Sequence, residues 1–149
     1  MMTSDFEMRG LDSDDAIRAA YPVMAELRPH LAQADFLATV RAQERDGYRL
    51  LGGYASGRLV SLAGYRIART LARGEHLFVD DLVTAKAAQR HGYGKAMLVR
   101  LARIAAEHGL SRLWLDSRDT ALTFYERVGF SVHTSKPCWI DAETLGRKG

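Results

Sequence analysis

Cysteine, proline and tryptophan are scarce in this 149-residue sequence, which has one, three and two of them respectively. A single Cys138 excludes an internal disulfide framework and is typical of a protein in a reducing compartment. No apolar run approaches the length of a membrane span. The start, Met1 to Asp5, lacks the basic segment and apolar stretch of a secretory signal. These absences predict a cytoplasmic protein with no membrane partner.

A strong charge of one sign is also missing. The 21 Lys and Arg residues are interspersed with 18 Asp and Glu residues, which leaves a formal net charge of +3 and a pI of about 9.2. A scattered excess of this size does not make the basic face that nucleic acid requires. The five histidines and the cysteine are too far apart in sequence for metal-ligand spacing. We therefore expect neither a nucleic-acid partner nor a bound metal.

The remaining composition is that of an ordinary globular protein, with 47% hydrophobic and 26% charged residues. The length suits one domain with a real core, and we find no repeat, low-complexity segment or long linker. The sequence predicts a single domain over residues 1–149.

Hydrophobic periodicity and turn residues predict alternating strands and helices. Strands are expected at 6–10, 48–55, 58–69, 75–84, 112–115, 130–134 and 138–141. Helices are expected from Ser13 or Asp14 to Leu27, across an ill-placed Pro22, from Gln33 to Asp46, after the Gly92 loop up to His108, and before Gly129. The strands at 75–84 and 112–115 flank a helix, so they should be parallel neighbours. The pattern indicates a mixed α/β fold with helices on both faces of the sheet.

The most informative segment is Gln89-Arg90-His91-Gly92-Tyr93-Gly94-Lys95, which joins a strand to a long amphipathic helix. Unpaired N–H groups and the macrodipole at a helix N-terminus favour an anion, and glycines let phosphate oxygens approach the backbone. The segment contains neither Gly-x-x-x-x-Gly-Lys-Ser/Thr nor a complete Gly-x-Gly-x-x-Gly, since residue 97 is Met. It predicts a pyrophosphate cradle; the alternative is glycine required only for loop conformation.

Two motifs carry a resemblance to a known family. The pattern Gln-x-x-Gly-x-Gly from Gln89 resembles the acetyl-CoA signature of the GNAT N-acetyltransferase superfamily, and Ala121 to Phe130 resembles its closing helix and strand. The resemblance extends from about Leu50 to about Trp139. It implies a mostly antiparallel sheet splayed at a central parallel strand pair. It also implies acetyl-CoA as co-substrate, direct acetyl transfer to a primary amine in a ternary complex, and a possible homodimer.

The resemblance also assigns the cofactor contacts. Backbone groups of Leu82 and Thr84 would face the cofactor, and the Leu82 N–H would hold the acetyl oxygen. Three positions depart from the family pattern, with Gln89 where Arg is commoner, Arg118 where many members have Asn, and Lys86 where Pro is frequent. The complete expected cofactor set is Leu82, Val83, Thr84, Gln89, Arg90, His91, Gly92, Tyr93, Gly94, Lys95, Arg118 and Phe124.

Acetyl transfer needs a base for the protonated amine and an acid for the leaving thiolate. Asp80 and Asp81 lie near the end of a strand, where a regular strand offers only one of two adjacent side chains to the substrate and a bulge changes that. The resemblance implies Asp80 as base, Asp81 as a residue that orients the ammonium or braces the bulge, and Tyr125 as general acid. The alternatives are acids that only solvate a loop and a tyrosine that only packs in the core.

The sequence leaves the acceptor open among a small amine, an amino acid, an aminoglycoside-like compound and a protein amino group. The paired acids favour a cationic acceptor. The alternative function is a non-catalytic acyl-CoA sensor or a partner-binding domain, which would use the same cradle.

Overall fold

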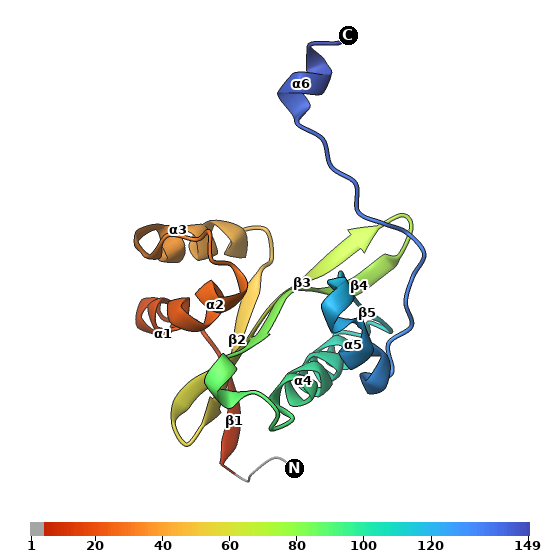
Figure 1. Ribbon diagram of the computed structural model, residues 1–149. Coiled ribbons are helices and arrows are strands. Elements are labelled where there is room, and N and C mark those ends of the chain that lie inside the picture. Colours follow the sequence, from red (N-terminus) through yellow and green to blue (C-terminus); the bar gives the residue numbers. More distant parts are fainter. Residues whose placement is uncertain (1–4) are drawn as a thin grey trace. The chain divides into compact units, whose positions relative to one another are not determined.

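The computed structural model describes residues 5–149 (Figure 1). Residues 1–4, which belong to the start segment interpreted above, lie outside the described residues. The chain divides into two compact units, Met1–Asp116 and Ser117–Gly149, and each is described by itself. Among the helices of residues 5–149, none has both the length and the apolar character to cross a membrane.

The first unit contains a five-stranded sheet in the order β1-β2-β3-β4-β5. The strands are β1 (Phe6–Gly10), β2 (Arg49–Ala55), β3 (Arg58–Thr70), β4 (Gly74–Thr84) and β5 (Leu113–Leu115). The first four pair antiparallel, and β4 pairs parallel with β5. This arrangement confirms the mixed, mostly antiparallel sheet. The hairpin between β2 and β3 turns at Ser56 and Gly57, whose φ values of 50° and 78° suit a type I′ turn.

The helix expected from residue 13 to Leu27 is two helices, α1 (Asp14–Ala19) and α2 (Tyr21–Leu27). Ser13 caps α1, because its Oγ accepts a hydrogen bond from the Ala16 N–H at 3.1 Å. Pro22 lies in the first turn of α2, where its missing N–H breaks no helical bond. The proline therefore starts a new helix. The next helix, α3 (Gln33–Glu44), follows the predicted span closely.

Helices cover both faces of the sheet, as predicted: α1, α2 and α3 lie on one face and α4 (Tyr93–Glu107) on the other (Figure 1). Two adjacent glycines of β2 show the division. A Cβ placed on Gly53 would lie 3.0 Å from Met97 Sδ in α4, whereas one on Gly52 would lie 3.0 Å from Leu11 Cδ2 in the opposite core. The core on the α1–α3 side comprises Leu11, Ile17, Ala20, Val23, Met24, Phe36, Val40, Tyr48, Leu50 and Leu62.

The second half of β4 has an open edge. Only Leu77–Val79 pairs with β5, while pairing with β3 continues to Thr84. Within residues 5–149, the segment from Asp80 to Thr84 therefore has a strand on one side only. Opposite β3, Tyr65 pairs with Val79 and Gly64 pairs with Asp81. Asp80 is thus the extra residue of a β-bulge.

The second unit contains the turn η2 (Asp119–Ala121) and the helices α5 (Leu122–Val128) and α6 (Ala142–Gly146). The prediction of strands at 130–134 and 138–141 was wrong, since the last strand in residues 5–149 ends at Leu115. Asp141, expected to end a strand, instead caps α6 and accepts from the Thr144 N–H at 3.2 Å. A strand requires a partner edge, and local side-chain preference does not supply one.

Candidate active site

The bulge at Asp80 determines which backbone groups of β4 point to the open edge. Before the bulge, the Leu77 N–H donates to Arg112 O at 3.1 Å, so Leu77 and Val79 face β5. After it, the Ala85 N–H donates to Val60 O at 2.8 Å. Because antiparallel pairs alternate, Leu82 and Thr84 then direct their N–H groups away from β3. These are the two residues that the family resemblance assigned to the cofactor edge.

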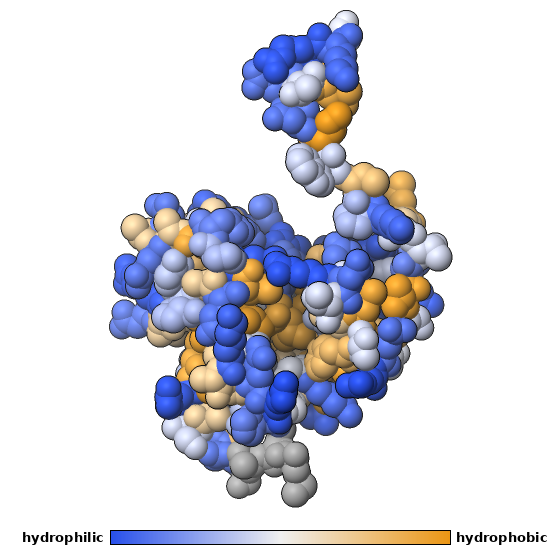
Figure 2. All heavy atoms as spheres, viewed as in Figure 1, coloured by the Kyte–Doolittle hydropathy of each residue, from blue (hydrophilic) through white to orange (hydrophobic). Residues whose placement is uncertain are grey.

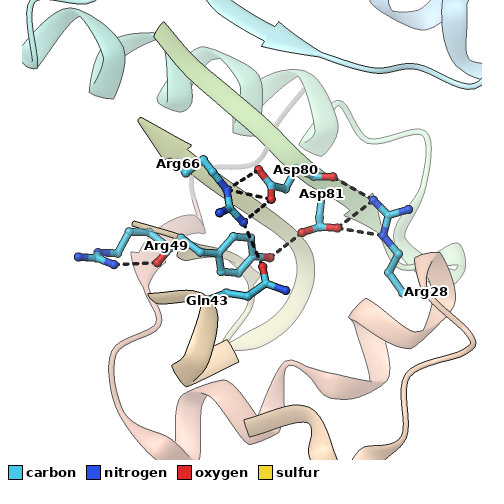
Figure 3. Close-up of polar contacts among 7 residues, drawn as sticks. Arg28, Gln43, Arg49, Arg66, Asp80 and Asp81 are labelled. Atoms are coloured by element: carbon cyan, nitrogen blue, oxygen red, sulfur yellow. Dashed lines mark hydrogen bonds and ion pairs between the residues drawn. The ribbon is translucent and has the colours of Figure 1, made fainter. Parts of the chain in front are cut away.

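The bulge is held by Arg28, which follows the last residue of α2 (Figure 3). Its Nη2 donates to the Asp80 carbonyl at 2.9 Å, and its Nε donates to Asp81 Oδ1 at 2.9 Å. The other carboxylate oxygen of Asp81 accepts from the Tyr48 hydroxyl at 2.6 Å. Both oxygens of Asp81 are therefore engaged, and the side chain is 13% exposed. These are the contacts of a residue that braces the bulge.

Tyr48 donates to Asp81 from a buried position, with only 4% of the residue exposed. Burial, followed by the nearby Asp81 charge, raises the pKa of the Tyr48 phenol above its ordinary value. The phenol therefore keeps the proton that it donates. Opposite Asp81 in β3 stands Gly64, where a Cβ would overlap the Tyr48 hydroxyl and lie 2.6 Å from Asp81 Oδ2. Only glycine leaves room for this hydrogen bond.

Asp80 forms an ion pair with a different arginine, Arg66. Arg66 Nη2 lies 2.6 Å from Asp80 Oδ2, and Arg66 Nε donates to both carboxylate oxygens at 3.1 Å (Figure 3). Arg66 also donates to Gln43 Oε1 at 3.1 Å. The hydrogen bond to Asp80 is the main cause that raises the Arg66 pKa. Across residues 5–149, no group of three His, Cys, Asp or Glu side chains converges to hold a metal ion.

The glycine loop folds back onto the end of β4 through Gln89. After the short turn η1 (Lys86–Ala88), the Gln89 side-chain amide donates to Thr84 O at 3.1 Å. Gly92 then caps α4 with φ of 80°, and a Cβ there would have no atom within 4 Å. The conformation, rather than lack of space, therefore demands glycine at this position. The first turn of α4 holds no acidic residue, so its positive dipole end is unopposed.

The aromatic residues of the loop have a packing role. The His91 ring stacks on Tyr93 at a centroid distance of 5.5 Å, and Tyr93 stacks on Phe6 at 4.6 Å. Tyr93 is 8% exposed, so its side chain belongs to the core and only its backbone is available to a ligand. Arg90 adopts φ of 71°, and Gly94 and Lys95 lie in the first turn of α4. These ring contacts hold the loop in place, and its backbone N–H groups are the donors that it offers to a ligand.

Apart from Val83, the other predicted residues lie in the second unit. Tyr125 in α5 packs edge-on against Phe124 and Phe130, with ring centroids 5.0 Å and 5.4 Å away. Burial raises the Tyr125 pKa above the ordinary value, so the phenol is protonated at neutral pH. Phe124 is 38% exposed, and Arg118 directly precedes η2. Val83, the remaining cofactor candidate, packs against the first unit's core.

A pocket of about 150 Å³ lies beside Asp81, between α2, α3 and the sheet. Its walls are Met24, Arg28, His30, Leu31, Phe36, Thr39, Val40, Gln43, Tyr48 and Asp81. Of these, only Asp81 was predicted from the sequence as a site residue. Arg28 and Tyr48 are 53 and 33 residues away from Asp81 in sequence, and no local motif marks either of them. Only the fold brings them to the site.

Comparison with known proteins assigns the class. Residues 14–130 match the model of the acetyltransferase (GNAT) family. The chain is also 31% identical over 132 residues to YhdJ, an uncharacterised N-acetyltransferase of Bacillus subtilis, and the match covers 85% of this chain and 93% of that protein. The chain therefore belongs to the GNAT acetyltransferase family, whose acyl donor is acetyl-CoA, and is an acyltransferase enzyme.

Two further likenesses concern named enzymes. The glucosamine 6-phosphate N-acetyltransferase of Trypanosoma brucei brucei is 29% identical over 139 residues, which cover 87% of this chain and 91% of that protein. The aminoglycoside N-acetyltransferase AAC(6')-Iy, solved in complex with CoA, superposes with a TM-score of 0.80 at 13% identity, over 92% of this chain and 95% of the other. The second likeness supports the fold alone.

Proposed function

We propose that this protein transfers the acetyl group of acetyl-CoA to a primary amine by direct attack in a ternary complex. The observation that carries the proposal is the bulged open edge of β4, which leads into the glycine loop at the start of α4. We further propose that the two units act as one acyltransferase domain over residues 1–149. The family match from 14 to 130 supports this, because it crosses the boundary at Asp116.

The cofactor would lie along this edge and loop. The pyrophosphate binds the backbone N–H groups of residues 89–95, where the helix dipole is positive. The pantetheine arm pairs with the open edge at Leu82 and Thr84. The Leu82 N–H then donates to the thioester oxygen, which becomes negative as the amine attacks. Arg118 and Phe124 of the second unit complete the proposed cofactor contacts.

Proton transfer completes the reaction. The amine nitrogen attacks the thioester carbon, the C–S bond breaks and an amide forms. We assign the amine proton to Asp80 through a water, since a carboxylate bonded to one arginine still has lone pairs to accept with. Tyr125 gives its proton to the departing thiolate, and its raised pKa supports this role because the phenol enters the reaction protonated. Asp81, bonded on both oxygens, holds the bulge.

The direct test is release of free CoA thiol from acetyl-CoA with a panel of primary amines, with the acetylated product identified by mass spectrometry. We expect turnover with at least one amine. CoA binding without turnover of any amine would indicate a non-catalytic acyl-CoA sensor instead.

The cradle is tested separately with Gly92→Asp, which places bulk and negative charge where the phosphates bind. We expect calorimetry to show loss of CoA binding. Gly57→Asp is the matched control, because Gly57 has a similar φ of 78° and also has no atom within 4 Å of a Cβ. Unchanged CoA affinity in a folded Gly92→Asp protein would refute the cradle.

A further inference from the structure

We infer that the acceptor is a small primary amine that also carries an anionic group, and that it binds in the pocket beside Asp81. This inference rests on the proposed acetyl transfer. Asp81 forms part of the pocket wall, and the next residue, Leu82, carries the N–H proposed to hold the acetyl oxygen. An amine in the pocket would therefore lie next to the reacting carbonyl.

The size of the pocket limits the acceptor. A cavity of about 150 Å³ holds one six-membered ring. Apolar side chains of α2 and α3, Met24, Phe36 and Val40, form one part of the wall. Polar groups of Arg28, Gln43 and Tyr48 form another. This mixed wall fits a single compact ring or a short chain with polar substituents.

The charges of the site argue against a polycation. Asp81 is the only carboxylate in the pocket wall, and Arg28 already pairs with it at 2.9 Å. The neighbouring Asp80 is paired with Arg66 at 2.6 Å. A second ammonium group on the acceptor would lose its water beside Arg28. No carboxylate there is free of an arginine partner to compensate that charge, so its burial is costly. The two acids that favour a cationic acceptor in the sequence are each neutralised in the fold.

The same arginine offers donors to an anion. A guanidinium has five N–H donors, and the bonds of Arg28 to Asp80 and Asp81 use its Nε and Nη2. Its Nη1 makes no hydrogen bond to any residue in 5–149, and one third of the side chain is exposed, at 33%. His30, an exposed residue of the pocket wall, adds ring nitrogens. A phosphate or carboxylate on the acceptor suits these donors, since arginine binds such groups with paired N–H bonds.

The experiment compares acceptors that differ only in the anion. Glucosamine 6-phosphate is paired with glucosamine, serine with serinamide, and spermidine serves as the polycation. We expect kcat/KM to be about tenfold or more higher for the anionic member of one pair, since hydrogen bonds to charged groups are strong. The pair that shows the preference separates phosphate from carboxylate. Equal rates within both pairs, or a preference for spermidine, would overturn the inference.

Arg28→Gln and His30→Gln test recognition in the same assay. Arg28 also braces the bulge, so Arg28→Gln will slow both members of a pair; the ratio between the members cancels this shared loss. We expect the anionic preference to fall to about one in Arg28→Gln and to fall less in His30→Gln. Arg45→Gln, an exposed arginine outside the pocket, should keep the parental ratio. A parental ratio in both pocket variants would show that Arg28 is only a brace.

Binding separates this inference from the proposed reaction. With CoA bound, calorimetry of glucosamine 6-phosphate and glucosamine measures recognition without chemistry. Preferential binding of the phosphate without turnover would support the pocket and refute the acetyl transfer. Turnover of uncharged or polycationic amines at rates equal to or above those of the anionic amines would support the acetyl transfer and refute the inference about the pocket.

Discussion

The two parts of the proposed site are built differently. The β4 part is held by residues far apart in sequence: Arg28, Tyr48 and Arg66 hold Asp80 and Asp81 from three separate parts of the chain. In the second unit, the aromatic neighbours of Tyr125 are its own sequence neighbours, Phe124 and Phe130.

The burial of the two units differs in the same way. The first unit has fully buried side chains such as Ile17, Leu62 and Met97, whereas no residue of 117–149 is buried. The C-terminal segment instead carries exposed apolar residues, including Trp139 at 92% exposure. In Figure 2 this segment is mostly blue, with some orange spheres among the blue ones. Substitutions at the β4 part should therefore change stability and activity together, whereas substitutions in the second unit should separate them.

The largest expected effect is on turnover in the second unit. Tyr125→Phe keeps the ring and its two aromatic contacts but removes the proton donor. We expect kcat to fall about 10²–10⁴-fold, the range for general acid catalysis. The melting temperature and CoA affinity should stay close to parental. The matched control is Tyr54→Phe in β2, whose turnover should not change. Near-parental kcat in Tyr125→Phe would remove the general-acid role.

Gly64→Ala tests the opposite case, in which packing and activity fail together. The added methyl group would overlap the Tyr48 hydroxyl, so either the hydrogen bond to Asp81 breaks or β3 shifts. Overpacking of this kind costs about 1–3 kcal/mol of unfolding free energy.

Urea unfolding and an acetyl-CoA assay on the same preparation check this result. Gly10→Ala in β1 is the control, since its nearest atom to a Cβ would be Asp12 Oδ1 at an ordinary 3.7 Å. A stable, fully active Gly64→Ala protein would show that the Tyr48 contact is dispensable.

Tyr48→Phe removes the hydroxyl without adding bulk, so its effect should be smaller. A hydrogen bond to a charged group contributes about 1.5–3 kcal/mol, and the exposed part of Asp81 recovers some of this through water, so the net loss of unfolding free energy should fall below that of Gly64→Ala. The variant should lose activity in proportion to its lost stability, because Asp81 keeps Arg28 but loses its second brace.

The same variant has a pH signature. The Tyr48 pKa is raised in the folded protein, whereas in the unfolded chain it returns to about 10. Its contribution to stability is complete below pH of about 10 and is lost as the pH rises further, because only the unfolded state releases the proton. Unfolding free energies of parent and Tyr48→Phe, measured across this range, should converge at high pH. A constant difference between them would contradict the role of burial.

The smallest effects concern the two helix caps. Ser13→Ala removes the cap of α1, whose Ile17 is fully buried, and should cost about 1 kcal/mol. Asp141→Ala removes the cap of α6, which has no buried residue. It should not change the unfolding of the first unit measured by urea. Equal losses in the two variants would show that the units unfold together.

Much of the fold could be predicted where the signal is local. The hairpin at Ser56-Gly57, the break at the Gly92 loop and the order β4, α4, β5 each depend on turn residues and on periodicity within a few positions. Parallel neighbouring strands need a long connection, usually a helix, because a short turn cannot join them. The helix between β4 and β5 therefore indicated their parallel pairing. The family motif that begins at Gln89 lies in one of these segments.

Strand pairing could not be predicted in the same way. Residues 130–134 and 138–141 have side chains that suit strands, yet they form none, because a strand exists only when another edge pairs with it.

The prediction of a single helix across Pro22 was also wrong, since the chain forms α1 and α2 there. Proline is disfavoured in a helix interior and suits the first turn of a helix, and Pro22 lies in the first turn of α2.

The sequence by itself determined that a glycine loop follows a strand bearing two acids and precedes a long helix, because these features depend on neighbouring residues. Only the tertiary structure decided which arginine meets which aspartate, and that Gly64 makes room for the Tyr48 hydroxyl at Asp81. It also formed the pocket from α2, α3 and the sheet. Such contacts join residues tens of positions apart, and they exist only after the register and the bulge bring these residues together.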